Sequence, residues 1–146
     1  AFSVNSLIQS AIDEVSGNNK IVFFKSFRNI NVISDKYKVY RVVVNLLDNA
    51  NKFTHQGTIF IHTKIIAGRL FILVKDNGIG FDLRNLGYFF QAFNQGAKKE
   101  TKQGLGLGLT IIKNYVESLS GKIRVKTKIG VGSSFFIFIP IDLTEE

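Results

Sequence analysis

Hydrophobic residues recur along this chain with two different periods, and the change from one period to the other marks out the secondary structure. Over residues 4–15 and 35–53 the apolar positions fall three or four residues apart, which predicts two amphipathic helices. The same spacing predicts a third helix from about 106 to 119. We expect the Asp35 carboxylate to cap the second helix and Gly121 to end the third.

Alternation of apolar and polar residues predicts strands. The strands are expected at 20–27, 58–66, 69–76, 122–128 and 133–139. The second and third are joined by a turn at Ala67-Gly68, and Pro140 stops the last. In the fourth strand Lys and Arg alternate with apolar residues, so its positive side should be a wet sheet face or a sheet edge.

Helices interspersed with mostly hairpin-linked strands predict a fold of the α+β class. We expect a two-layer α/β sandwich, in which about three helices cover one face of a mixed, mostly antiparallel sheet of about five strands. No internal repeat or linker is visible, and the 146 residues fit one domain over 1–146. Residues 82–103 follow neither period and are polar, glycine-containing and lysine-rich, so we expect a mobile loop with a short helix there.

Composition excludes several kinds of chemistry. There is no Cys, which excludes disulfides, thiolate catalysis and Cys-bound zinc, and two His residues are too few for a His-rich metal site. A hydrophobic content of 45% with a single Pro argues against disorder. No apolar run reaches the length of a membrane span and no signal peptide is visible, so we expect a soluble domain of a reducing compartment without membrane contact.

The formal net charge is +8. One interpretation is an anionic partner such as nucleic acid, a membrane surface or an acidic protein. The other, which we favour, is solvated lysines with some attraction for a polyphosphate. The basic residues are scattered along the sequence and base-stacking aromatic residues are not interleaved with them, so nucleic-acid binding is not expected.

Asn45 and Asn49 lie four residues apart in the second predicted helix and share a face, with Arg41 and Lys52 near it. Amide oxygens and a cation on one helix face suit a hydrated Mg²⁺ with phosphates, because magnesium takes few protein oxygens and keeps several waters. Taken alone, an ordinary polar helix side explains the same residues and is the more frequent case.

Asp76 ends the third predicted strand on the side that carries Ile72 and Val74, which should be the core side. A carboxylate at a buried strand end needs hydrogen-bond donors, and the amino group of an adenine would supply one. Gly78 and Gly80 let the chain turn sharply and pass close to such a ring. The alternative is an Asp-Asn-Gly hairpin turn.

Glycines alternate with leucines where the third helix is expected to begin, at Gly104, Gly106 and Gly108. Bare backbone at a helix N-terminus lets N–H groups close on phosphate, and the helix dipole favours the negative charge. The alternative is a flexible hinge. No Gly-Lys-Ser/Thr follows as in a P-loop, and no strand leads directly into the segment as in a Rossmann fingerprint.

The order and spacing of these segments resemble the catalytic, ATP-binding domain of sensor histidine kinases. That domain has a Bergerat-type fold and belongs to a wider ATPase group with type II topoisomerases, mismatch-repair ATPases and heat-shock chaperones. The resemblance covers nearly the whole chain. Its matching segments are the N box at 45–54, the first glycine box at 76–80, the F box at 89–93, the second glycine box at 104–109 and the closing hairpin at 130–135.

The resemblance implies a cytoplasmic domain, the cytoplasmic part of a membrane-anchored sensor kinase, with ATP and Mg²⁺ as cofactors. Asn49 would hold Mg²⁺, and Asp76 would receive the adenine amino group in a pocket shaped by Gly78 and Gly80. Lys52 would approach the phosphate chain.

The resemblance also assigns catalytic roles and a lid. Asn45 stands where related ATPases often carry a glutamate that activates water, so Asn45 and Lys52 are the expected catalytic residues and hydrolysis should be slow. Residues 82–104 would form an ATP lid anchored by Phe90 and Phe93. The backbone that would wrap the phosphates belongs to Gly104, Leu105, Gly106, Leu107 and Gly108.

Kinases of this family phosphorylate a His on a separate dimeric helical hairpin, the dimerisation domain, and a response regulator acts downstream. His55 and His62 fall in a turn and on a strand, so we expect this chain to lack its phosphoacceptor domain. Tyr88 stands where many members carry a basic residue, which keeps open a non-catalytic nucleotide-binding pseudokinase or switch. A third possibility is an ATPase module of the topoisomerase or mismatch-repair type, against which Asn45 argues.

Overall fold

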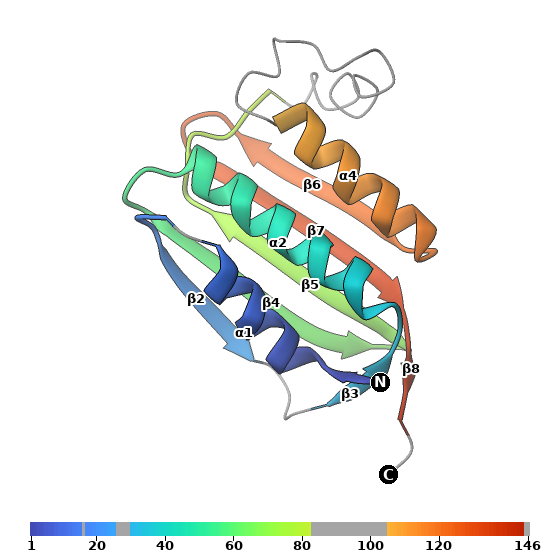
Figure 1. The fold of residues 1–146 in the computed structure, drawn as a ribbon. Coiled ribbons are helices and arrows are strands. Elements are labelled where there is room, and N and C mark those ends of the chain that lie inside the picture. Colours follow the sequence, from blue (N-terminus) through green and yellow to red (C-terminus); the bar gives the residue numbers. More distant parts are fainter. Residues whose placement is uncertain (16, 26–29, 83–104, 145–146) are drawn as a thin grey trace.

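The computed structural model describes residues 1–15, 17–25, 30–82 and 105–144. Its helices are α1 (Val4–Glu14), α2 (Lys36–Phe53) and α4 (Leu105–Ser118). Its strands are β1 (Phe2–Ser3), β2 (Lys20–Lys25), β3 (Asn31–Ile33), β4 (Thr58–Ile66), β5 (Arg69–Asp76), β6 (Lys122–Lys128), β7 (Gly132–Pro140) and β8 (Asp142–Leu143). Figure 1 shows the three described helices on one face of the larger sheet, with α2 between α1 and α4, which confirms the predicted two-layer sandwich.

The larger sheet has the strand order β2-β4-β5-β7-β6. The β2–β4 pair is parallel and the other neighbouring pairs are antiparallel, so the sheet is mixed and mostly antiparallel, as predicted. Many side chains on the helix side are fully buried, among them Ile59, Ile72 and Ile137. β6 lies at one edge with its Lys and Arg side chains exposed, which confirms the wet edge expected from its pattern.

A second, small sheet was not predicted. β1, β3 and β8 pair in the order β1-β3-β8, and both pairings are antiparallel. They bring Val32, which is fully buried, and Phe2 into the core. Strands of two or three residues are too short to show a period, so the hydrophobic pattern could not reveal them.

Two local predictions are confirmed and one segment lies outside the structure. Asp35 caps α2, because its Oδ1 accepts a hydrogen bond from the Lys38 N–H at 3.2 Å. Ala67 and Gly68, with φ of 50° and 75°, form the left-handed turn of the β4–β5 hairpin. Residues 83–104, which hold most of the predicted loop and lid, lie outside the described residues. Among the described helices, none is long and apolar enough to cross a bilayer.

The end of α4 corrects the prediction made for Gly121. Ser120, not Gly121, adopts the left-handed conformation, with φ of 59°. Its N–H donates to the Glu117 carbonyl at 2.9 Å, while the Gly121 N–H donates to the Val116 carbonyl at 2.8 Å, the paired bonds of a Schellman ending. Glycine is needed at 121 for another reason, since a Cβ there would meet the Phe138 carbonyl oxygen of β7 at 2.5 Å.

Substitutions at these two positions should therefore have opposite effects. Gly121→Ala should lower the free energy of unfolding by about 1–3 kcal/mol, because the added methyl overpacks against the β7 backbone. Ser120→Gly should raise it by up to about 1 kcal/mol, because glycine adopts a left-handed φ without a Cβ clash. Urea denaturation measures both, and a Gly121→Ala variant as stable as the parent would contradict the close approach of α4 and β7.

Candidate functional site

Asp76 lies at the end of β5 and faces the helices. Ile72 and Val74 are buried on the same side of the strand, as predicted, and Asp76 is only 6% exposed. Its Oδ1 accepts two backbone hydrogen bonds, from the Gly78 N–H at 2.9 Å and from the Ser133 N–H at 3.3 Å. The next described element along the chain after β5 is α4 and not a strand paired with β5, so the segment after Asp76 is not the hairpin turn considered as the alternative. It is a turn closed by the Asp76 carboxylate, which accepts from the Gly78 N–H.

The carboxyl of Asp76 has a raised pKa. Burial is the main cause, and the two N–H donors from Gly78 and Ser133 offset it only in part. The nearby Thr54 hydroxyl also lowers the pKa of Asp76 by favouring the charged form. The Thr54 Oγ1 is buried and has no hydrogen-bond partner within bonding distance among the described residues, so its effect on the carboxylate is that of a nearby dipole. Both backbone bonds end on Oδ1, which leaves Oδ2 as the acceptor suited to a ligand that brings its own N–H donor.

The glycines at 78 and 80 hold the chain after β5 against two other stretches of backbone. A Cβ at Gly78 would collide with the Phe53 carbonyl oxygen at the end of α2 and lie 2.7 Å from Thr54 Oγ1. The neighbouring Ile79 N–H donates to the same Phe53 carbonyl at 2.9 Å. Gly80 has φ of 67°, and a Cβ there would collide with the backbone at the end of β6. Both glycines therefore allow close packing around Asp76.

Asn45 and Asn49 lie on the α2 face predicted for them. Asn49 is only 4% exposed, and the Nδ2 atoms of both residues are buried without a hydrogen-bond partner in the described part of the chain. Asn49 lies against the beginning of α4, because a Cβ at Gly108 would be 2.8 Å from Asn49 Oδ1. Gly108 thus lets the N-terminal end of α4, where backbone N–H groups have no helical partner, approach the Asn49 amide.

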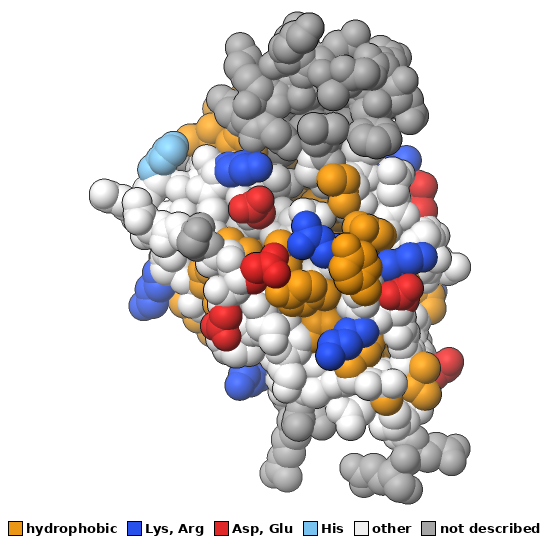
Figure 2. Space-filling model, viewed as in Figure 1, with side chains coloured by type: hydrophobic (Ala, Val, Ile, Leu, Met, Phe, Trp, Pro, Cys, Tyr) orange, Lys and Arg blue, Asp and Glu red, His pale blue; other side chains and the backbone are white. Residues whose placement is uncertain are grey.

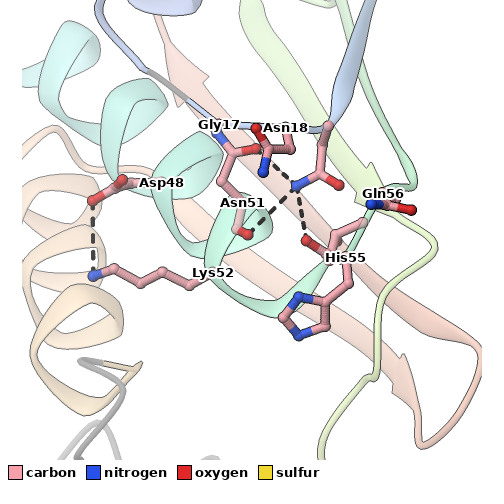
Figure 3. A pocket seen from close by; sticks show the side chains of 9 residues that line it. Gly17, Asn18, Asp48, Asn51, Lys52, His55 and Gln56 are labelled. Carbon is pink, nitrogen blue, oxygen red and sulfur yellow. Dashed lines mark hydrogen bonds and ion pairs between the residues drawn. The ribbon is translucent and has the colours of Figure 1, made fainter.

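Lys52 extends along α2 toward Asp48, away from Asn51 and His55, as Figure 3 shows. Its Nζ lies 3.8 Å from Asp48 Oδ2, and both side chains are about half exposed. Such a solvated pair is weak, so Lys52 is available to a stronger anion. The pair borders a hollow of about 470 Å³, whose other walls are residues 17–19 and the turn after α2. Arg41, also expected near this face, pairs with Glu14 of α1 at 3.5 Å.

Asn19, which the sequence did not single out, ties the end of α2 to the start of β4. Its Nδ2 donates to the Thr54 carbonyl at 2.8 Å, and its Oδ1 accepts from the Gly57 N–H at 2.9 Å. Asn77 supports the same junction from β5, since its Oδ1 accepts from the Thr58 N–H at 2.9 Å. The bond between Asn19 and Thr54 spans 35 residues, so no local spacing signal could have revealed it.

Other predicted site residues are only partly covered by the structure. Leu105, Gly106 and Leu107 form the first turn of α4, whereas Phe90, Phe93 and Gly104 lie outside the described residues. Within the described ranges, no three His, Cys, Asp or Glu residues gather where they could hold a metal ion. A metal at this site would therefore depend on neutral oxygens, such as Asn49 Oδ1, and on oxygens of the ligand.

Residues 34–143 match the family described as "Histidine kinase-, DNA gyrase B-, and HSP90-like ATPase". The autoinducer 2 sensor kinase/phosphatase LuxQ of Vibrio cholerae is 41% identical over 121 residues, which cover 79% of this chain. The matched segment is 14% of LuxQ, so this chain spans a small part of that curated relative.

Solved structures share the fold. The catalytic domain of histidine kinase ThkA has a TM-score of 0.78 at 25% identity, covering 95% of this chain and 93% of that one. Full-length ShkA in complex with AMPPNP has a TM-score of 0.83 at 23% identity, covering 98% of this chain and 31% of that one. The topology and the family match agree, so this chain belongs to the histidine kinase-, DNA gyrase B- and HSP90-like ATPase family and is an ATP-binding catalytic domain of the sensor histidine kinase type.

Proposed function

We propose that this chain binds Mg-ATP between α2, the end of β5 and the beginning of α4, and transfers the γ-phosphoryl group to a His on a separate, dimeric helical-hairpin domain. The observation that carries the proposal is Asp76, a buried carboxylate with Oδ1 bound by backbone N–H groups and Oδ2 available to a donor. The adenine amino group is such a donor, and the flanking glycines leave room for a flat ring near the backbone.

Asn49 fits the magnesium role. It is a buried amide with an unpartnered Nδ2 among the described residues, and it lies at the N-terminal end of α4. Phosphates are favoured at that helix end by free N–H groups and by the helix dipole, and Mg²⁺ binds readily to phosphate oxygens together with one protein oxygen. When bound, the metal would neutralise phosphate charge, while the Asn49 amide would position it.

Lys52 and Asn45 would serve the transfer itself. The weak pair of Lys52 with Asp48 leaves its ammonium group free to exchange onto a phosphate. Asn45 carries a neutral amide, which cannot take a proton from water, so the γ-phosphoryl group would be kept for transfer and not lost to hydrolysis. Transfer of this kind depends mainly on positioning and charge neutralisation.

The chain would act as one part of a larger signalling protein. LuxQ is named a sensor kinase/phosphatase, and this chain matches 14% of it. By that analogy we place the chain in the cytoplasm, where ATP is available, with a dimerisation and phosphoacceptor domain as its direct partner and a response regulator downstream.

The first prediction concerns adenine. In Asp76→Asn the Oδ1 atom can still accept from Gly78 and Ser133, but an NH₂ group replaces Oδ2 and would face the adenine amino group. Leaving buried donors unpaired costs about 1–3 kcal/mol, so ATP affinity should fall by about tenfold or more. Calorimetric titration measures the change, and unchanged affinity for ATP would refute the assignment of Asp76.

The stability of the same variant is the control. Because the pKa of Asp76 is raised in the folded state, its protonation stabilises the fold below the ordinary Asp value of about 3.9, and that stabilisation is lost as pH rises through the raised pKa. Asp76→Asn does not titrate, so the stability of the variant relative to the parent should fall as the pH is lowered from 7, because only the parent gains stability on protonation. A variant that is largely unfolded at pH 7 would mean that weaker binding reports unfolding.

A second prediction concerns the metal. Asn49→Ala should weaken ATP binding in magnesium far more than it weakens adenosine binding, because only the former uses the amide oxygen. Asn49→Asp keeps an oxygen at that position and should keep the magnesium dependence. Titrations of ATP with magnesium and with EDTA measure it, and full magnesium dependence in Asn49→Ala would exclude Asn49 as a ligand.

A third prediction concerns the acceptor. Given radiolabelled ATP alone, the chain should retain no label, because His55 and His62 lie in a turn and on β4 and not on a helical hairpin. With the dimeric hairpin domain of a related kinase such as LuxQ added, label should appear on that domain's His, and Asp76→Asn should reduce it. Label on His55 or His62 would overturn the proposal. ATP binding without any transfer would support the pseudokinase alternative raised by Tyr88.

A further inference from the structure

The face of the large sheet that points away from the helices carries charge of one sign. Along β6 every second residue is exposed and basic, while the intervening residues turn toward the core. Pairing with the neighbouring strands extends the pattern across the sheet, and no outward position on the described strands of this sheet is Asp or Glu. We call this surface the basic sheet face; its cations are Lys20, Lys64, Arg69, Lys75, Lys122, Arg124, Lys126 and Lys128.

The helical side of the molecule has a different charge arrangement. Figure 2 shows basic and acidic side chains interspersed there. The ion pairs that involve described helices are Arg41–Glu14, Lys52–Asp48 and Lys113–Glu117, whereas no cation of the basic sheet face forms an ion pair with a described residue. Among the described residues, the unpaired positive charge is therefore concentrated on one side of the sheet. Because every second residue of a strand points to the same face, basic residues that are scattered in the sequence lie together on one face of the sheet.

Aromatic rings lie between these cations. On β2 and β4, Phe24 stacks on Phe60 at 5.8 Å, and Phe24 is half exposed. The row continues through His62 to Phe71, which is 5.2 Å from Phe138 of β7, and Lys64 Nζ lies 5.5 Å from the centre of the Phe71 ring. The basic sheet face thus combines cations with half-buried apolar surface, and its aromatic rings are of the residue type that is enriched at protein interfaces.

One end of this face is hollowed. A shallow depression of about 380 Å³ lies where β5, β7 and β6 run side by side, and its walls include Lys75, Lys126 and Lys128. Asp76 at the end of β5 also borders the depression, although its carboxylate is turned to the helix side, where it accepts from the Gly78 and Ser133 N–H groups. Ser134 of β7 lies between them in the strand order, opposite both Lys75 and Lys126. A carboxylate that entered this depression would meet several ammonium groups and a hydroxyl donor.

We propose that the basic sheet face is a docking surface for an acidic protein partner, with Asp or Glu side chains entering the depression beside Lys126 and apolar side chains packing on the ring of Phe24. Five strands about 4.8 Å apart and about eight residues long give a face of roughly 600 Å², or about 1,200 Å² counted on both partners. That area reaches the lower end of specific protein interfaces. The surface lies on the side of the sheet opposite to Asn49 and α4, so the proposal does not depend on the nucleotide site.

Nucleic acid and membrane fit this surface less well. Base stacking needs open ring faces, yet Phe71 is 9% exposed and meets its neighbour His62 edge-on, at an interplanar angle of 88°. A flat sheet also offers no element to enter a groove of duplex nucleic acid. Insertion into a bilayer needs several protruding apolar groups, but on the described strands of this face the exposed large apolar residues are Phe24 on β2 and Ile66 at the end of β4.

The test is NMR titration of the isotope-labelled chain with a glutamate-rich peptide containing interspersed leucines. Amide shifts should map to β5, β6 and β7 and to β2 around Phe24, and the affinity should fall as ionic strength rises. Lys122→Glu/Lys126→Glu should weaken peptide binding by about tenfold or more, with Lys122→Gln/Lys126→Gln giving a smaller loss. The matched control is Lys36→Glu/Lys38→Glu, in the first turn of α2, which should bind the peptide like the parent.

Several results would overturn the proposal. They are the absence of any shift at millimolar peptide, shifts confined to the helical side, and an equal loss of affinity in the control variant. Tighter binding to an oligothymidylate of equal charge would instead identify a nucleic-acid surface, and tighter binding to phosphatidylserine vesicles would identify a membrane surface. Calorimetry with ATP on the same variants is a separate readout, and unchanged ATP affinity is expected in all of them.

Discussion

The backbone contact between the end of α2 and the segment after β5 sets the geometry of the site. The Ile79 N–H donates to the Phe53 carbonyl, which is possible only because Gly78 presents no Cβ to that carbonyl. The same contact brings the Thr54 hydroxyl near the Asp76 carboxylate. Asn19 holds the other side of the α2 end. A residue with a side chain at 78 would therefore displace the strand end and the helix end from each other.

Polar groups without partners are concentrated near this contact. Asn45 Nδ2, Asn49 Nδ2 and Thr54 Oγ1, all on or beside the C-terminal half of α2, are buried without hydrogen bonds to described residues. Each such group costs about 1–3 kcal/mol if it stays unpaired. Asp76 adds a buried carboxylate with a raised pKa. Several unpaired polar groups can occur together in a stable fold when a ligand or a neighbouring segment forms hydrogen bonds with them. Their position agrees with a nucleotide site at this end of α2.

Hydrophobic periodicity predicted the helices and the strands of the large sheet, because each is long enough to show its period and each buries one side. It missed β1, β3 and β8, which are two or three residues long. The site was predicted through Asp76 and Asn49, which stand in short recognisable segments. Asn19 could not be predicted, since its partner Thr54 lies 35 residues away. The sequence pattern also predicted that Gly121 ends the third helix, whereas the left-handed residue at that end is Ser120 and glycine at 121 allows the close approach of β7.

The two sides of β5 illustrate how one strand can serve two surfaces. Asp76 is turned to the helices and Lys75, its neighbour, is turned to the open side, and successive residues alternate in this way along the whole strand. The pairing of Asp76 with Ile59 and Ser133, and of Lys75 with Phe60 and Ser134, carries this division to the adjacent strands. A register shift of one residue would bury Lys75 and expose Asp76, so the buried acceptor and the basic sheet face exist only together. The strand pairing that places the Asp76 carboxylate on the core side therefore also determines which residues face the open side. Only residues at those open-side positions can change charge without altering the core.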